Sequence, residues 1–173
     1  RGLTAFTATE NFLIDENIEA DGHDYFSLGA FEVSNNTRLL AWSSDIDGGE
    51  YYTLHIRDTE TGLDVPDVIA DTASGGLAWS SNDDWLFYVT PDEQMRPWQV
   101  WRHQVGTAVT DDVMVYEDAD ERFFVGLAAS RSGQLIMIES ASKTSSETWI
   151  LDASTPTAQL LCVAPRREDL EYT

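Results

Sequence analysis

The sequence has few of the residues that would connect it to disulfide bonds, nucleic acid or a lipid bilayer. Cys162 is its only cysteine, so no intrachain disulfide can form, and we expect a reducing, cytoplasmic location. Of 173 residues, 10 are Lys or Arg and 31 are Asp or Glu, and Lys143 is the single lysine. The formal net charge of −21 argues against nucleic acid and anionic membranes as partners. No apolar run approaches the roughly 18–20 residues of a membrane span.

Motifs of the common catalytic and cofactor sites are also missing. The segment nearest to G-x-S-x-G, Thr72–Gly76, lacks the first glycine, so no nucleophile elbow is predicted. No Cys/His spacing indicates zinc, and no glycine-rich loop indicates a phosphate site. His23 lies in a predicted turn, and His55 and His103 lie in predicted strands, where no neighbour marks them as a base. We therefore expect no catalytic, cofactor-binding or metal-binding residue in this chain.

Two short segments resemble functional motifs only in part. Ser140–Lys143 has the spacing S-x-x-K, but the companion motifs of penicillin-recognising enzymes are absent, and a hairpin turn is predicted. Asp45–Glu50 is acidic and glycine-containing, yet it lacks the sixth-position glycine and twelfth-position glutamate of an EF-hand. A turn between two strands is predicted there as well.

Aromatic residues and one loop remain as candidates for binding a partner. The tryptophans either form a binding surface or fill the space between packed sheets, and we favour packing; they are Trp79, Trp85, Trp98, Trp101 and Trp149. Pro91–Pro97 is the longest loop predicted within a repeat, and its length allows contact with a partner. Cys162 lies in the apolar run Leu160–Val163 and is expected to be a small core side chain.

A repeat dominates the organisation of the chain. Phe26–Gly62 is predicted to form three strands, because apolar and polar residues alternate on both sides of turn sequences rich in Asn, Asp and Gly. Its segment Leu39–Trp42 recurs as Leu86–Val89 and as Leu135–Ile138, at spacings of 47 and 49 residues. A repeat of about 40–50 residues built from four short strands is typical of a β-propeller blade.

The repeat predicts an all-β protein, an incomplete β-propeller of three four-stranded antiparallel blades. The segments are a connector at 1–25, blades at 26–71, 72–117 and 118–165, and the start of a further blade at 166–173. Because a closed ring needs about four to eight blades, we expect the chain to be a fragment. Its two open flanks then expose apolar surface, and self-association through them is predicted.

The order and spacing of several short motifs resemble a known family. They are Leu13–Asn17, Tyr25–Gly29, Arg57-Asp58 with Thr61-Gly62, Arg96-Pro97 with Val100–His103, Asp112 with Tyr116-Glu117, Glu121–Phe123, and Ser145 with Glu147 and Trp149. In this series the chain resembles the propeller domain of the prolyl oligopeptidase family of serine peptidases, and within it the oligopeptidase B (protease II) branch. The likeness extends from Leu13 to Tyr172.

The resemblance implies a seven-bladed propeller set over an α/β-hydrolase domain that carries the Ser, Asp and His of the catalytic triad. It also implies that the propeller acts as a lid that admits only short peptides, which are cut after Arg or Lys. No triad residue maps onto this chain, so its own hydrolase domain and short basic peptides are the expected partners.

Two other functions remain open from the residues themselves. A stand-alone interaction scaffold is one, although the Gly-His and Trp-Asp pairs of WD40 blades are missing. A propeller glycosidase with paired carboxylates is the other, although no pair of acids stands out. The excess acidic charge either keeps the surface solvated or concentrates cationic peptides.

Overall fold

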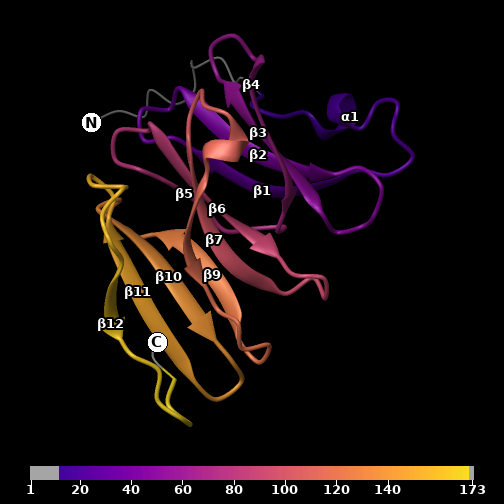
Figure 1. The fold of residues 1–173 in the computed structure, drawn as a ribbon. Helices are drawn as coiled ribbons and strands as arrows, with labels where there is room; N and C mark the ends of the chain where they lie inside the picture. Colours follow the sequence, from indigo (N-terminus) through magenta and orange to yellow (C-terminus); the bar gives the residue numbers. More distant parts are fainter. Residues whose placement is uncertain (1–11, 172–173) are drawn as a thin grey trace, which may run out of the picture.

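A computed structural model describes residues 12–171, which form three four-stranded antiparallel sheets (Figure 1). Each sheet is a meander in chain order. The first contains β1 (Ser27–Val33), β2 (Leu39–Asp45), β3 (Tyr52–Asp58) and β4 (Asp64–Thr72); the second contains β5 (Leu77–Trp79), β6 (Trp85–Pro91), β7 (Pro97–Gln104) and β8 (Val113–Glu117); the third contains β9 (Phe124–Ala129), β10 (Leu135–Ala141), β11 (Ser146–Asp152) and β12 (Leu161–Ala164). The predicted all-β class with three four-stranded antiparallel blades is thereby confirmed.

Among residues 12–171, helical structure is confined to two single turns. The helix α1 (Glu16–Glu19) precedes the first sheet, and Asp15 caps it by accepting a hydrogen bond from the amide of Asn17 at 3.0 Å. A 3-10 turn, η2 (Val109–Asp111), connects β7 to β8. Within residues 12–171 no helix is long and apolar enough to cross a membrane.

The first hairpin turn of every sheet is built in the same way. The hydroxyls of Ser34, Ser80 and Ser130 accept hydrogen bonds from the amides of Leu39, Trp85 and Leu135 at 2.9, 3.0 and 3.1 Å. The fourth residue of each turn adopts positive φ, at +62° for Thr37 and Asp83 and +70° for Gly133, and a residue in this left-handed region is common in short hairpin connections. Equivalent serines are thus 46 and 50 residues apart, whereas the predicted spacings are 47 and 49. The predicted alignment of blade two with its neighbours is therefore wrong by one residue.

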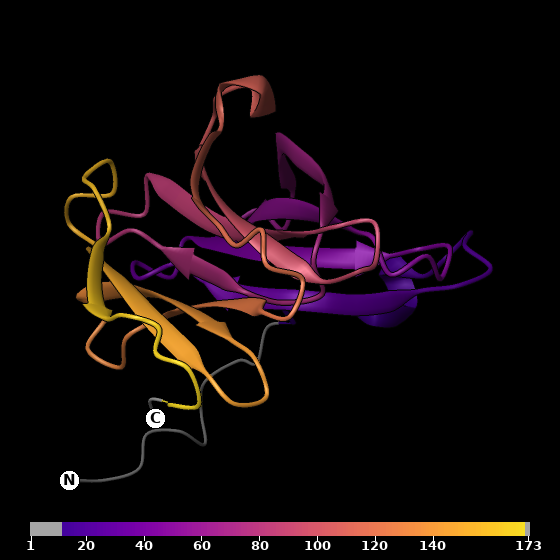
Figure 2. The same ribbon diagram turned by 60° about the horizontal axis from the view of Figure 1, so that its bottom comes forward.

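The sheets pack face to face in chain order, with the second between the first and the third (Figures 1 and 2). β6 shows this most clearly, because successive side chains of a strand point to opposite faces. Leu86 and Tyr88 join the apolar cluster against Ile56 of the first sheet, whereas Phe87 joins the cluster against Ile136 of the third. All five side chains are at most 3% exposed, so the core consists of the two seams between blades.

Hydrogen bonds across the first seam fix how the blades meet. Asp83 accepts from the amides of Asn35 and Asn36 at 2.8 and 2.9 Å, and from the Asn35 side chain at 2.7 Å. Trp79 donates its indole N–H to the carbonyl of Glu32 at 3.1 Å. These bonds pair polar groups that would otherwise lose water contacts when the blades pack.

Candidate functional site

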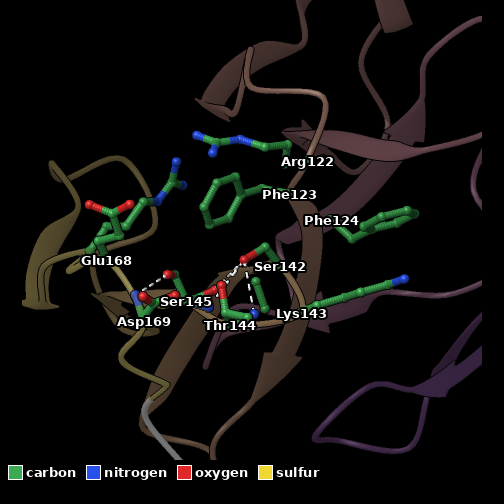
Figure 3. Close-up of a pocket in the computed structure, with 11 residues that line it drawn as sticks. Arg122, Phe123, Phe124, Ser142, Lys143, Thr144, Ser145, Glu168 and Asp169 are labelled. Atoms are coloured by element: carbon green, nitrogen blue, oxygen red, sulfur yellow. Dashed lines mark hydrogen bonds between the residues drawn. The ribbon is translucent and has the colours of Figure 1, made fainter.

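A cavity of about 810 Å³ lies where the β8–β9 connection, the β10–β11 turn and the segment after β12 meet (Figure 3). It is lined by Arg122, Phe123, Phe124, Ala141, Ser142, Lys143, Thr144, Ser145, Arg166, Glu168 and Asp169. Figure 3 shows Phe124 and Lys143 pointing to one side, with Glu168 and Asp169 on the opposite side. The volume and the aromatic lining are in the range of small-ligand sites.

The turn between β10 and β11 forms the floor of this cavity. The Ser142 hydroxyl accepts from the amides of Thr144 and Ser145 at 3.3 and 3.1 Å. The amide of Asp169 donates to the Ser145 hydroxyl at 3.0 Å. This last bond holds the segment after β12 against the turn, so two stretches of chain 24 residues apart share one wall.

A buried polar network underlies the cavity. Asp118 accepts hydrogen bonds from Ser140 and from Arg166, and Arg166 also lies 3.3 Å from a carboxylate oxygen of Glu147. Tyr116 donates to that same oxygen at 2.7 Å; burial, with the neighbouring Glu147 adding to it, raises the pKa of Tyr116. Each carboxylate is engaged by donors, so the network is a structural brace.

Arg166 is also held by a ring. Its guanidinium carbon lies 3.4 Å from the centre of the Phe123 ring, an arrangement in which the ring face attracts the cation. Phe123 is 3% exposed. The start of the segment after β12 is therefore tied to the connection that enters blade three.

Arg96 organises the other side of the β8–β9 connection. One of its terminal nitrogens donates to the carbonyls of Asp118, Asp120 and Phe123 at 3.0, 3.3 and 2.8 Å. Its Nε donates to Asp92 at 2.8 Å. This single buried side chain thus connects the Pro91–Pro97 loop to the wall of the cavity, a role that the sequence does not indicate.

The S-x-x-K segment carries no nucleophile with a base. Ser140 is fully buried and donates to Asp118, and the Lys143 side chain has no ion pair among residues 12–171. No histidine is bonded to either residue in that range. The segment forms the end of β10 and the following turn, as predicted.

The Asp45–Glu50 segment is a turn in which the Asp45 carboxylate accepts hydrogen bonds from backbone amides. Asp45 is 1% exposed and accepts from the amides of Asp47, Gly48 and Glu50 at 3.0, 2.9 and 2.9 Å. Burial raises the pKa of Asp45, but the backbone donors outweigh it and hold the pKa below its ordinary value. Within residues 12–171 no cluster of three His, Cys, Asp or Glu side chains could hold a metal ion.

The three histidines occupy very different surroundings. His23 is exposed in its turn. His55 stacks on Trp42 with ring centres 4.9 Å apart, and burial lowers its pKa against the opposing effect of Asp64. His103 is fully buried between Asp67 of β4 and Asp112 in the connection before β8. The sequence separates these aspartates from His103 by 36 and 9 residues, so local patterns could not reveal the cluster.

Four of the five candidate tryptophans belong to the two apolar clusters or pack against them: Trp79, Trp85, Trp101 and Trp149. Trp79 is 4% exposed and bonds to Glu32 across the first seam. Trp101 donates to Gln99 and Thr90 at 3.1 and 3.2 Å, and Trp149 donates to Glu147 at 3.2 Å. Arginines 96 and 102 lie over the rings of Trp98 and Trp85. The arrangement of these four residues matches the predicted packing role, whereas Trp98 lies outside both clusters.

Comparison with known proteins places this architecture in a family. Residues 3–173 match the description "Prolyl oligopeptidase, N-terminal beta-propeller domain". "Protease 2" of Moraxella lacunata is 34% identical over 166 residues, covering 95% of this chain and 24% of the relative. "Dipeptidyl aminopeptidase BI" of Pseudoxanthomonas mexicana is 37% identical, covering 95% of this chain and 23% of the relative.

Solved structures agree with the sequence matches. Oligopeptidase B from Leishmania major superposes with a TM-score of 0.86 at 28% identity, over 93% of this chain and 23% of that one. Oligopeptidase B from Trypanosoma brucei, described with covalently bound antipain in a closed form, has a TM-score of 0.85 at 31% identity, over 94% and 23%. The chain spans about a quarter of the length of these relatives. It belongs to the prolyl oligopeptidase family, within whose N-terminal β-propeller domain its three blades lie.

Proposed function

We propose that this chain is the non-catalytic lid of a serine oligopeptidase that hydrolyses short peptides after Arg or Lys. The observation that carries the proposal is the coverage: the chain matches relatives named as peptidases over 95% of its own length but only 23 to 24% of theirs. The triad and the pocket for the basic side chain are then supplied by an α/β-hydrolase domain, the first partner of the propeller.

The charge of the propeller supports a basic substrate. The β2–β3 turn and the β6–β7 turn lie at one end of the sheets, since Tyr51 donates to the carbonyl of Asp92 at 3.4 Å. This end carries exposed carboxylates, among them Asp47, Glu93 and Glu121. A surface field of one sign raises the local concentration of oppositely charged ligands and is weakened by salt.

Cleavage specificity is tested with the full-length enzyme. Peptides identical except for the residue before the scissile bond, Arg, Lys, Gln or Leu, are compared by kcat/KM. We expect cleavage after Arg and Lys only. Equal cleavage after Gln or Leu contradicts the substrate assignment, and failure with every peptide contradicts the peptidase assignment.

The lid and steering roles need separate measurements. A series of peptides of increasing length, ending with a folded protein that carries the same site, is expected to show a sharp loss of cleavage with size. The triple variant Asp47→Asn, Glu93→Gln, Glu121→Gln is expected to raise KM for basic peptides at low salt while kcat is unchanged. An unchanged KM means that the acidic charge serves solvation alone.

The outer face of blade three supports a further contact. Phe124, Met137, Leu161 and Val163 on this sheet are 55, 38, 63 and 57% exposed, whereas β6 of the middle blade is buried on both faces. We propose that another blade covers this face in the complete enzyme and that the 173-residue chain alone self-associates through it. Light scattering that shows a monomer at all concentrations contradicts the self-association.

We also propose a cytoplasmic location, on the basis of the single cysteine. Cys162 is unpaired and half-buried on β12. Fractionation of cells that produce the tagged protein tests this location, and recovery in the extracellular or periplasmic fraction contradicts it.

A further inference from the structure

The seam between blades one and two contains a cluster of one histidine and two aspartates that is closed to solvent. His103 on β7 has no exposed surface, and its two ring nitrogens face two carboxylates. Nδ1 lies 2.7 Å from an oxygen of Asp112, in the connection before β8, and Nε2 lies 3.2 Å from an oxygen of Asp67, on β4 of blade one. The side chains of the two aspartates are only 2 and 4% exposed.

The carboxylates already accept bonds from other donors. Asp67 accepts from the amide of Gly106 at 2.6 Å. Asp112 accepts from the hydroxyl of Tyr88 at 2.8 Å; burial, reinforced by Asp112, raises the pKa of Tyr88, so this hydroxyl keeps its proton. Two titratable groups therefore face His103 directly, Asp67 from β4 and Asp112 after η2. A third, Tyr88 from β6, is connected to His103 through its hydrogen bond to Asp112.

Hydrogen bonding constrains the proton content of the cluster. An ionised carboxylate can only accept, so each ring nitrogen of His103 must donate if both aspartates are ionised. A neutral imidazole leaves one nitrogen as an acceptor facing an oxygen, and that contact then needs a proton on the carboxyl. The surroundings are apolar: Leu86 is opposite His103 in the sheet and belongs to the same cluster as Ile69 of β4.

We propose that Asp67, His103 and Asp112 form a proton-carrying latch between blades one and two, in which both ring nitrogens donate. Through the latch, β4 at the outer edge of blade one is fixed to β7 and to the connection before β8. The bond from an imidazolium to the Asp67 carboxylate is charge-assisted and stronger than a neutral hydrogen bond, so removal of the Asp67 charge is expected to loosen both blades. The proposal does not depend on the peptidase assignment.

The proton content is tested first, in the unmodified full-length protein with ¹⁵N-labelled histidine. Long-range ¹H–¹⁵N spectra at neutral pH distinguish a doubly protonated ring from either neutral tautomer. We expect both nitrogens of His103 to carry hydrogen, and its signal is assigned by its loss in His103→Gln. A neutral tautomer at His103 overturns the proposal.

The mechanical role is tested by hydrogen exchange. Asp67→Asn preserves the shape of the side chain but removes its charge. Asp64→Asn makes the same change at a second aspartate of β4, which forms a partly exposed ion pair with Arg57 of β3. We expect Asp67→Asn to speed exchange at least about tenfold in both 64–72 and 103–113, and Asp64→Asn to leave 103–113 unchanged. Unchanged exchange in 103–113 for Asp67→Asn, or equal effects of the two variants, overturns the latch; if Asp67→Asn does not fold, the histidine spectra decide.

Discussion

Replacing Arg96 with Ala is expected to destabilise the propeller far more than replacing any exposed arginine. Arg96 is 6% exposed, and it bonds to the carboxylate of Asp92 and to the carbonyls of Asp118, Asp120 and Phe123. Truncation leaves the carboxylate without its cation and the carbonyls of Asp118 and Phe123 without this donor, whereas the carbonyl of Asp120 still accepts from the amide of Phe123 at 2.9 Å. The β8–β9 connection, which forms a wall of the cavity, loses its anchor.

The magnitude follows from the contacts. Breaking a buried ion pair by removing one partner costs about 3–5 kcal/mol, and a hydrogen bond to a charged group contributes about 1.5–3 kcal/mol. These terms overlap because one side chain makes all the contacts. Water can reach part of the freed backbone, since Asp120 lies at the surface. We therefore expect a loss of about 4 kcal/mol in the free energy of unfolding.

Urea unfolding followed by tryptophan fluorescence measures this loss, and Trp98 is a local reporter because Arg96 lies 5.8 Å from its ring centre. With a slope of about 1–3 kcal/mol per molar urea, the midpoint falls by roughly 2 M. Arg122→Ala is the control: its side chain is 78% exposed and bonds only to Asp120, so no measurable change is expected.

A third variant separates charge from geometry. Arg96→Lys retains the cation beside Asp92, but an ammonium group cannot bond to Asp92 through one nitrogen and to the carbonyls through another, so an intermediate loss is expected. The reasoning is refuted if Arg96→Ala behaves like Arg122→Ala, or if Arg96→Lys is as stable as the unmodified protein.

Three further predictions concern single positions. Phe87→Ala should lower the free energy of unfolding by about 3–5 kcal/mol in a denaturation experiment, because Phe87 is completely buried in the seam between blades two and three. Gly76→Ala should destabilise clearly more than Gly106→Ala: both glycines have a φ of +84°, but a Cβ at Gly76 meets Val89 at 2.7 Å whereas nothing lies within 4 Å at Gly106. For Asp45, whose pKa the fold lowers, the stability advantage over Asp45→Asn should be full above the ordinary carboxyl pKa and disappear as the pH falls through the folded value; a pH-independent difference in midpoint contradicts this.

The strands and turns were predictable because their causes are local. The hydroxyl of Ser34 bonds to an amide five residues later, and the alternation of Tyr52, Leu54 and Ile56 with half-buried or exposed neighbours matches the burial along β3. All the residues that produce these two features lie within one hairpin, so the sequence of that hairpin is enough to predict them. The alignment between blades was wrong by one residue because apolar runs such as Leu86–Val89 contain no internal marker of register.

The buried polar network and the histidine cluster were not predictable for the opposite reason. Asp118 bonds to Arg166 over 48 residues, and His103 bonds to Asp67 over 36 residues. Each partner taken alone looks like an ordinary polar residue of a strand or connection. Their pairing depends on how one blade is placed on the next, and a single sequence carries no direct record of that placement.

The contrast between β6 and β10 indicates that the seams of the propeller are not equivalent. β6 is buried on both faces, and no residue from Leu86 to Val89 is acidic or basic. On β10, Ile136 and Ile138 are buried, while Met137 and Glu139 point outward. Whatever covers this face must leave the Glu139 carboxylate in water or supply a cation, since burial without a partner is costly. We therefore expect amides of β10 to exchange faster than those of β6 in the full-length protein, and equal protection of the two strands contradicts a wetter outer seam.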